Sequence, residues 1–181
     1  MNFDEFSFSV SKIKNIPLPG QVSQFKMAPP FRKELLERSK EVINFAKKAG
    51  VLALIYPDKN RQASLVLILR KTYEGVHSGQ VGFPGGKLEE HDTSLEMAAL
   101  REANEEIGVP ISELKILKQL TELYIPPSNF YVQPYLGISG NNLSFYKEDS
   151  EVEEIIEVPL RHFFNDDLVI SKIVSTPLFI P

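Results

Sequence analysis

Residues 83–109 read FPGGKLEEHDTSLEMAALREANEEIGV, and the fold of the chain is expected to form around this stretch. A glycine pair and an acidic loop are followed by residues that recur at the spacing of one helical face, namely Leu95, Ala98, Ala99, Glu102, Glu105 and Glu106. The first half of that face is small and apolar, whereas the second half carries three carboxylates. Leu100, Ala103 and Ile107 continue an apolar stripe on the adjacent face. The pattern predicts a helix that packs at its start and carries charged chemistry at its end.

The three carboxylates of this helix need a partner if they are partly buried. Like charges three and four residues apart repel by about a few tenths of a kcal/mol on an exposed helix, and by more in a buried site. A divalent cation would turn that repulsion into attraction, and ligands that are all oxygen suit Mg²⁺ or Mn²⁺. The alternative is a solvated acidic face, which is the usual explanation for a charge run on a helix taken alone.

The stretch resembles the Nudix box, which runs glycine, five residues, glutamate, seven residues and then R-E-U-x-E-E-x-G-U, where U is a bulky apolar residue. Residues 101–109 match the second half, with the small Ala103 at one U position, and Gly86 matches the leading glycine. The spacing from Gly86 to Arg101 is one residue longer than in the general motif, and Asp92 stands near the expected glutamate.

Three features are similar to the Nudix subfamily that acts on coenzyme A. They are the longer loop with its aspartate, the string H-x-G-x-x-x-F-P-G-G that begins at His77, and LYIPPSNFYVQPYLG at residues 123–137. The resemblance covers roughly residues 60–160. It implies an α/β fold, namely a Nudix-type α/β/α sandwich with a mixed central sheet.

The function that the resemblance implies is metal-dependent hydrolysis of a pyrophosphate bond. The implied substrate is coenzyme A or acyl-CoA, cleaved to a phosphopantetheine product and adenosine 3′,5′-bisphosphate, with Mg²⁺ or Mn²⁺ as cofactor. The alternative substrate is another nucleoside diphosphate derivative, such as ADP-ribose. A nucleotide-sensing module without catalysis is the alternative class, but such modules typically lose box carboxylates, and all three are present here.

The resemblance also assigns roles residue by residue. The implied metal ligands are Glu102, Glu105, Glu106 and the backbone carbonyl of Gly86, and the implied catalytic residues are Glu102, Arg101 and Glu105. The implied substrate contacts are His77, Ser78, Gln80, Phe83 and Gly85. The general base stays open between Glu102 and one of the later glutamates Glu151, Glu153 and Glu154.

Two residues of the loop and helix have competing structural roles. Asp92 is either a helix cap, with Thr93 and Glu96 as a capping box, or the replacement for the first glutamate of the motif. For Arg101 we favour a salt bridge to an acidic loop residue over direct contact with phosphate.

Length and composition fit one globular domain. The chain has 181 residues, of which 43% are hydrophobic and 24% charged. A net charge of −4 argues against nucleic acid or an anionic membrane as partner. The partner that the resemblance implies is a small nucleotide substrate of the coenzyme A type. There is no cysteine, which excludes thiol chemistry. No secretory or membrane-spanning pattern is found, and the cytoplasm is the expected location. A homodimer is compatible with these features.

Outside the box, the sequence predicts further elements along a single domain over residues 1–181. Residues 1–50 form an N-terminal extension, with an extended lead-in to residue 30 and an amphipathic helix over 31–49 closed by Gly50. The box occupies residues 86–109. Apolar runs predict strands covered on both faces at 51–57 and 63–71, and further strands are expected at 113–125 and 130–139. Residues 148–160 are expected to form an acidic loop that enters a strand, followed by a short helix around RHFFN and a final strand in LVISKIVSTPLFIP.

Overall fold

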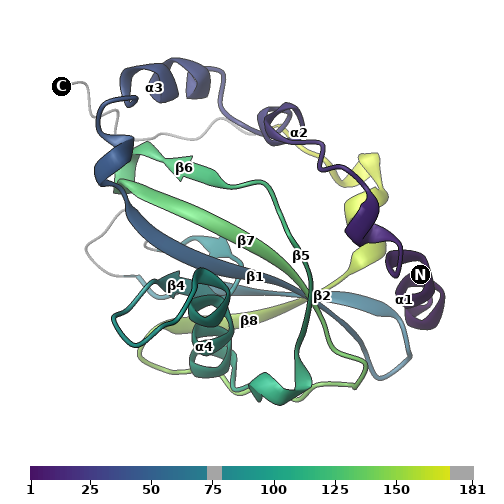
Figure 1. Cartoon of the computed structure of the whole chain (residues 1–181). Helices are drawn as coiled ribbons and strands as arrows, with labels where there is room; N and C mark the ends of the chain where they lie inside the picture. Colours follow the sequence, from purple (N-terminus) through teal and green to yellow (C-terminus); the bar gives the residue numbers. More distant parts are fainter. Residues whose placement is uncertain (73–78, 172–181) are drawn as a thin grey trace.

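A single mixed sheet forms the centre of the computed structural model, which describes residues 1–72 and 79–171 (Figure 1). Its strands are β1 (Lys47–Pro57), β2 (Ala63–Arg70), β3 (Val81–Gly82), β4 (Gly85–Lys87), β5 (Lys115–Gln119), β6 (Leu123–Ile125), β7 (Phe130–Ile138) and β8 (Val152–Pro159). The main order is β3-β2-β1-β7-β5, while β4 pairs with β1, β6 with β7 and β8 with β2. Among these described strands β1 and β7 pair in parallel and the others pair antiparallel. The prediction of an α/β fold with a mixed sheet is therefore confirmed.

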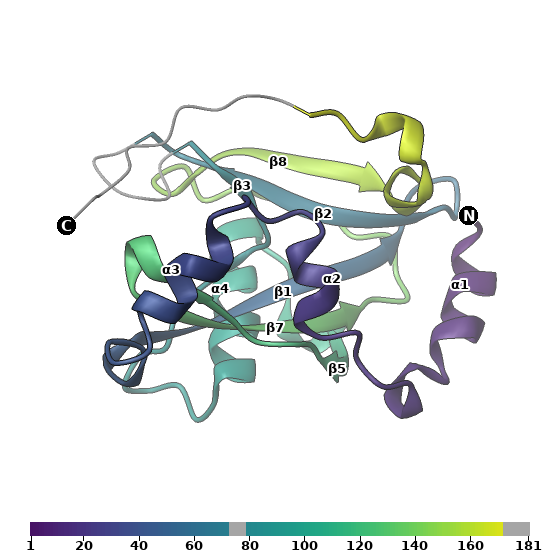
Figure 2. The ribbon, with the colours of Figure 1, turned by 90° about the horizontal axis from the view of Figure 1, so that it is seen from above.

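Helices lie on both sides of this sheet. They are α1 (Phe3–Val10), α2 (Gln21–Phe25), α3 (Arg32–Arg38) and α4 (Leu95–Ile107). Figure 2 shows α2 and α3 in front of β1 and β7, with α4 behind the same strands. Among the described residues, none of the helices combines the length and apolar character needed to cross a bilayer.

Alternation along β1 and β2 fills a separate core on each face of the sheet. Leu52, Leu54 and Tyr56 point toward α4, while Ala53 and Ile55 pack on the opposite side with Phe3 of α1. Because a strand turns successive side chains to opposite faces, a strand with both faces covered needs an unbroken apolar run. The two-sided covering predicted for these strands is thus confirmed.

The predicted helix over residues 31–49 is wrong in its second half. The helix α3 ends at Arg38, a 3₁₀ turn (Ile43–Phe45) follows, and β1 begins at Lys47. Gly50 is therefore not a helix cap but a strand residue paired with Gly86. The lead-in to residue 30 is also more regular than expected, since it contains α1 and α2.

Two further segments differ in detail from the prediction. The segment 113–125 is not one strand but two, β5 and β6, which pair with different parts of β7. Residues 126–128 form a 3₁₀ turn closed by Asn129 in the left-handed conformation (φ 51°). The acidic loop, β8 and the short helix (Leu160–Phe164) follow as predicted. The expected last strand lies largely at residues 172–181, outside the described part of the chain.

Candidate active site

Helix α4 positions the box carboxylates, and its two ends are fixed by polar contacts. Ser94 begins the helix, and its side chain accepts a hydrogen bond from the Met97 backbone N–H at 3.1 Å. The capping role predicted for Asp92 or Thr93 is therefore wrong. Gly108 ends the helix in the left-handed conformation (φ 71°), which glycine adopts without steric cost.

A group of three carboxylates lies where α4 meets the acidic loop before β8. Oxygen atoms of Glu102, Glu106 and Glu151 all lie within 4.8 Å of one another. Glu102 and Glu106 are four residues apart and share one helical face. The sequence left the late glutamate open among three residues, and the structure brings Glu151 into this group rather than Glu153 or Glu154.

Backbone hydrogen bonds hold Glu151 beside the helix end. The Glu148 N–H donates to the Glu106 carbonyl (3.1 Å), and the Glu151 N–H donates to the Glu148 carbonyl (3.2 Å). The Lys71 N–H, just beyond β2, donates to the Glu151 carbonyl (2.9 Å). The loop therefore donates a hydrogen bond to a carbonyl that has no partner within α4, and the same set of contacts positions Glu151.

Glu106 is the most enclosed member of the group. Its side chain is 2% exposed and accepts a hydrogen bond from the Gly85 N–H at 2.7 Å, with Arg70 Nη2 at 3.4 Å. Burial raises the pKa of Glu106 to about 7, and the negative charges of Glu102 and Glu151 also raise it. Arg70 and the Gly85 N–H act in the opposite direction. The Arg70 guanidinium also donates to the Gly85 carbonyl at 2.6 Å, so Arg70 fixes both the glycine turn and the helix end.

Glycines allow the sheet and the helix to approach each other closely at this point. A Cβ on Gly86 would lie 2.3 Å from Oε1 of Glu102, so the Glu102 carboxylate rests directly on the Gly86 backbone. Gly85 has a φ of +146° and lies against Gly50 and Val51 of β1. Burial raises the pKa of Glu102, while Arg101 acts in the opposite direction. The structure thus places Gly86 beside the carboxylate group, as expected for a residue of that site.

Arg101 connects the acidic loop to the helix. Its guanidinium donates to both carboxylate oxygens of Asp92 at 3.0 Å and to the Lys87 carbonyl at 3.2 Å. The hydrogen bonds from Arg101 hold the pKa of Asp92 below its usual value, and the Arg101 pKa is raised in turn, chiefly by Asp92. The salt bridge favoured for Arg101 is therefore present, and Asp92 is its partner in place of the motif's glutamate.

Glu105 lies outside the carboxylate group. Its side chain is 55% exposed and forms an ion pair with Arg101 Nη1 at 2.8 Å, one helical turn away. The role of Glu105 as a metal ligand therefore stays a prediction.

The donor set suits a hard divalent cation. Three carboxylates converge without any nitrogen or sulfur ligand, and two of them have raised pKa values because burial and mutual repulsion disfavour their charge. Oxygen-only sites of this kind favour Mg²⁺, Mn²⁺ or Ca²⁺ over softer metals. The residues present therefore fit a bound divalent metal ion.

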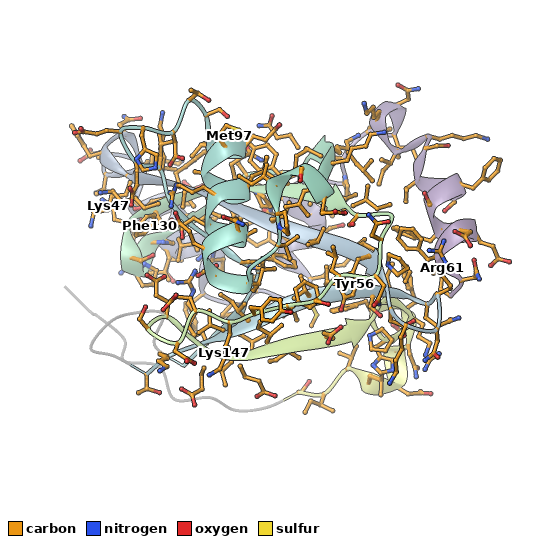
Figure 3. All side chains as sticks on the ribbon, turned by 90° about the horizontal axis from the view of Figure 1, so that it is seen from below. Lys47, Tyr56, Arg61, Met97, Phe130 and Lys147 are labelled. Carbon is orange, nitrogen blue, oxygen red and sulfur yellow. The ribbon has the colours of Figure 1, made fainter. Side chains whose placement is uncertain are left out.

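A cleft of about 800 Å³ opens beside the carboxylate group. Arg70, Gly85 and Gly86 lie at its wall, and each of them contacts Glu106 or Glu102. Phe130 also lines it, and its ring lies 5.7 Å from the Nζ of Lys47 (Figure 3). Three of the predicted substrate contacts, Gln80, Phe83 and Gly85, line this cleft, whereas His77 and Ser78 lie outside the described residues.

Sequence reasoning missed Arg70 as a site residue. Arg70 is the last residue of β2, at an irregularity where Leu69 pairs with Glu154 and Arg70 already pairs with Val152. The sequence does contain a signal for it, because Arg70 directly follows the apolar run at residues 65–69, and a charged side chain at the end of a buried run needs a partner.

Comparison with known proteins identifies the family of the chain. The family model described as the NUDIX domain matches residues 46–170, more than half of the chain. An uncharacterized Nudix hydrolase NudL of Yersinia enterocolitica is 40% identical over 118 residues, which cover 65% of this chain and 60% of that protein. A NudL protein of Yersinia pestis is 34% identical over 139 residues, covering 77% of this chain and 68% of the relative.

Solved structures agree at the level of the fold. The Nudix hydrolase RenU of M. smegmatis superposes with a TM-score of 0.53 at 22% identity, covering 65% of this chain and 73% of that one. The Nudix domain of Shewanella oneidensis NrtR, solved with ADP-ribose, gives a TM-score of 0.51 at 18% identity, covering 66% and 76%. Because the family model matches more than half of the chain, and the box and the converging carboxylates agree with it, the chain belongs to the Nudix family.

Proposed function

We propose that this Nudix enzyme hydrolyses the pyrophosphate bond of coenzyme A or of an acyl-CoA, using Mg²⁺ or Mn²⁺. The observation that carries the proposal is the group formed by Glu102, Glu106 and Glu151, which adjoins a cleft of about 800 Å³. A cleft of that size suits a ligand larger than a mononucleotide, because small-molecule sites commonly measure about 300–1,000 Å³.

The lining of the cleft supports a long, polyanionic and partly apolar substrate. Among the described residues that line the cleft, the charged ones are all cationic, namely Arg32, Arg70 and Lys87. The apolar part includes Met27, Phe83, Ile125 and Phe130. Cations suit the phosphates of coenzyme A, and the apolar wall suits its pantetheine arm. The strings around His77 and at 123–137, which resemble the coenzyme A subfamily, support the same substrate.

Each residue of the site has a proposed role. Glu102, Glu106 and Glu151 would hold the metal, which when bound neutralises charge on the pyrophosphate oxygens and lowers the pKa of a water molecule. The Gly86 carbonyl and Glu105 are proposed as further ligands. Arg70 holds Glu106 and the glycine turn in place, and Arg101 holds the acidic loop through Asp92. We propose Glu102 or Glu151 as the general base, because the carboxylates of both lie in this group.

The test is turnover of a substrate panel by the purified protein. Coenzyme A, acetyl-CoA, ADP-ribose and NADH are incubated with Mg²⁺ or Mn²⁺, and products are separated by chromatography. Release of adenosine 3′,5′-bisphosphate from coenzyme A, at a higher kcat/KM than for the other ligands, is the expected result. A preference for ADP-ribose would replace the proposed substrate, and no turnover of any panel member would overturn the enzymatic proposal.

A further inference from the structure

The N-terminal segment before β1 is attached to the edge of the sheet by three long polar side chains. Lys118 donates to the carbonyls of Ile13, Lys14 and Ile16. Gln24 donates to the carbonyls of Thr121 (3.0 Å) and Glu122 (3.2 Å), and Arg32 donates to the carbonyl of Tyr124. The family match begins at residue 46, so this attachment brings residues outside the matched region next to the site.

The attached segment forms part of the wall of the cleft. Of the residues that line the 800 Å³ cleft, five come from this segment: Gln24, Met27, Ala28, Pro29 and Arg32. A second cavity of about 410 Å³ lies beneath α2 and α3 and shares Gln24, Ala28, Arg32 and Leu123 with the first. Arg32 therefore lines both cavities. It is the first residue of α3, which lies on the same side of the sheet as α2 (Figure 2).

Arg32 differs from the other cations of the cleft in its partners. Arg70 already faces Glu106 and the Gly85 carbonyl, and Lys87 is exposed to solvent. Arg32 is partly buried, burial lowers its pKa, and among the described residues no carboxylate lies within salt-bridge distance of it. A guanidinium has five N–H donors in a planar fork, and one backbone carbonyl leaves most of them available.

We infer that Arg32 is a substrate-binding residue whose guanidinium binds a phosphate group of the ligand in the cleft. A partly desolvated arginine without an acidic partner is costly unless an anion neutralises it, and phosphate fits the guanidinium fork with two parallel hydrogen bonds. The inference rests on the proposed function, because it takes the ligand to be a nucleoside diphosphate derivative. Two groups of such a ligand offer this chemistry, the pyrophosphate itself and an additional phosphate monoester on the ribose.

The test measures binding without turnover. Calorimetry in EDTA gives the Kd of coenzyme A, 3′-dephospho-coenzyme A and ADP-ribose for the wild type, Arg32→Gln, Arg32→Lys and Lys118→Met. Lys118→Met is the matched control, because among the described residues Lys118 hydrogen-bonds only to Ile13, Lys14 and Ile16, which line neither cavity, and the bonds that anchor the cleft-lining part at Gln24 and Arg32 do not involve it. We expect Arg32→Gln to weaken binding of coenzyme A by tenfold or more, Arg32→Lys to restore part of it, and Lys118→Met to stay within twofold of the wild type.

The comparison of ligands identifies the phosphate. Equal weakening of coenzyme A and its 3′-dephospho form by Arg32→Gln assigns the contact to the pyrophosphate, and weakening of coenzyme A alone assigns it to the ribose phosphate. Wild-type affinity of Arg32→Gln for all three ligands would overturn the inference, as would an equal loss in Lys118→Met. If the wild type binds coenzyme A but does not cleave it with metal, the proposed function fails while the assignment of Arg32 stands.

Discussion

At the scale of single residues, Glu106 combines near-complete burial with a position in the carboxylate group. Replacing it by glutamine keeps the shape of the side chain and removes the charge that would bind a metal ion. We predict that Glu106→Gln lowers kcat by at least about 100-fold, the size of effect seen when electrostatic stabilisation of a transition state is lost. Steady-state kinetics with coenzyme A and Mg²⁺ measures the change.

The matched control is Glu153→Gln, which changes an exposed glutamate two residues from Glu151 and outside the carboxylate group. This variant should keep kcat within about twofold of the wild type, because exposed surface changes rarely matter. Near wild-type turnover of Glu106→Gln, in protein that shows a normal unfolding transition, would remove Glu106 from the site.

Asp92 provides a prediction about pH. Its side chain is 3% exposed, and Arg101 holds its pKa below the ordinary value of 3.8. A carboxylate with a lowered pKa stabilises the fold above the unfolded-state pKa, and this contribution is lost as the pH falls through the lower folded-state pKa. Asp92→Asn should therefore lower the free energy of unfolding by about 1–3 kcal/mol at pH 7.

The same pair of proteins gives the pH test. The difference in stability between wild type and Asp92→Asn should shrink as the pH falls below 3.8, when Asp92 of the wild type becomes protonated. Urea titrations at several pH values measure it. A difference that stays constant from pH 7 to pH 2.5 would show that the ion pair with Arg101 is not its source.

The sequence predicted the site residues only where local spacing decides their positions. Glu102 and Glu106 share a helical face, and the structure brings them together. The sequence predicts Glu105 on the same face, but in the structure Glu105 pairs with Arg101 instead. The i,i+4 spacing of Arg101 and Glu105 in the sequence already indicates that ion pair. Glu151 could not be chosen from the sequence, since its position depends on hydrogen bonds between a loop and the far end of α4.

At the scale of elements, the packing of α4 on β1 depends on Gly50. A Cβ added there would lie 2.1 Å from the Leu95 carbonyl oxygen, a backbone atom that cannot move alone. We predict that Gly50→Ala destabilises the protein by about 1–3 kcal/mol through overpacking, and that it lowers activity by displacing the helix from Gly86. Thermal unfolding and kcat are the measurements.

Gly140→Ala is the matched control, since a Cβ at Gly140 would meet no atom within 4 Å. It should change the free energy of unfolding by less than about 0.5 kcal/mol. Equal stability of the two variants would contradict the close approach of α4 to β1.

The elements that the sequence predicted well are those with an unambiguous hydrophobic pattern. The apolar runs of β1 and β2 and the box helix needed no long-range information. The sequence predicts a helix end at Gly50 because glycine often follows a helix. The amphipathic spacing before Gly50 is compatible both with one long helix and with the observed short helix followed by a 3₁₀ turn. Its true place depends on pairing with Gly86 and Gln133, which local sequence does not reveal.

At the scale of the whole molecule, metal binding and stability should be linked. Three carboxylates held together by the fold repel one another, and a cation that binds the folded form alone stabilises it by mass action. We predict that millimolar Mg²⁺ or Mn²⁺ at pH 8 raises Tm by several degrees, since about 1 kcal/mol shifts Tm by about 2–4 °C at this size. Differential scanning fluorimetry with and without EDTA measures the shift.

Glu106→Gln should lose most of this metal-dependent shift. In EDTA it should unfold at the same temperature as the wild type or higher, because it no longer buries a charge whose pKa is raised to about 7. An unchanged metal response in Glu106→Gln would place the stabilising cation elsewhere on the molecule.

The parallel pairing of β1 with β7 has a consequence for biosynthesis. Lys47 pairs with Phe130, and Ser64 of β2 pairs with Pro159 of β8, so the sheet closes only through contacts between distant parts of the chain. Such topologies fold slowly, because long loops lose entropy before their contacts form. A nascent chain that has reached only residue 140 therefore lacks both β8 and Glu151, and we expect ribosome-bound chains of that length to be protease-sensitive and unresponsive to metal. The carboxylate group would then be assembled late, after most of the polypeptide has left the ribosome.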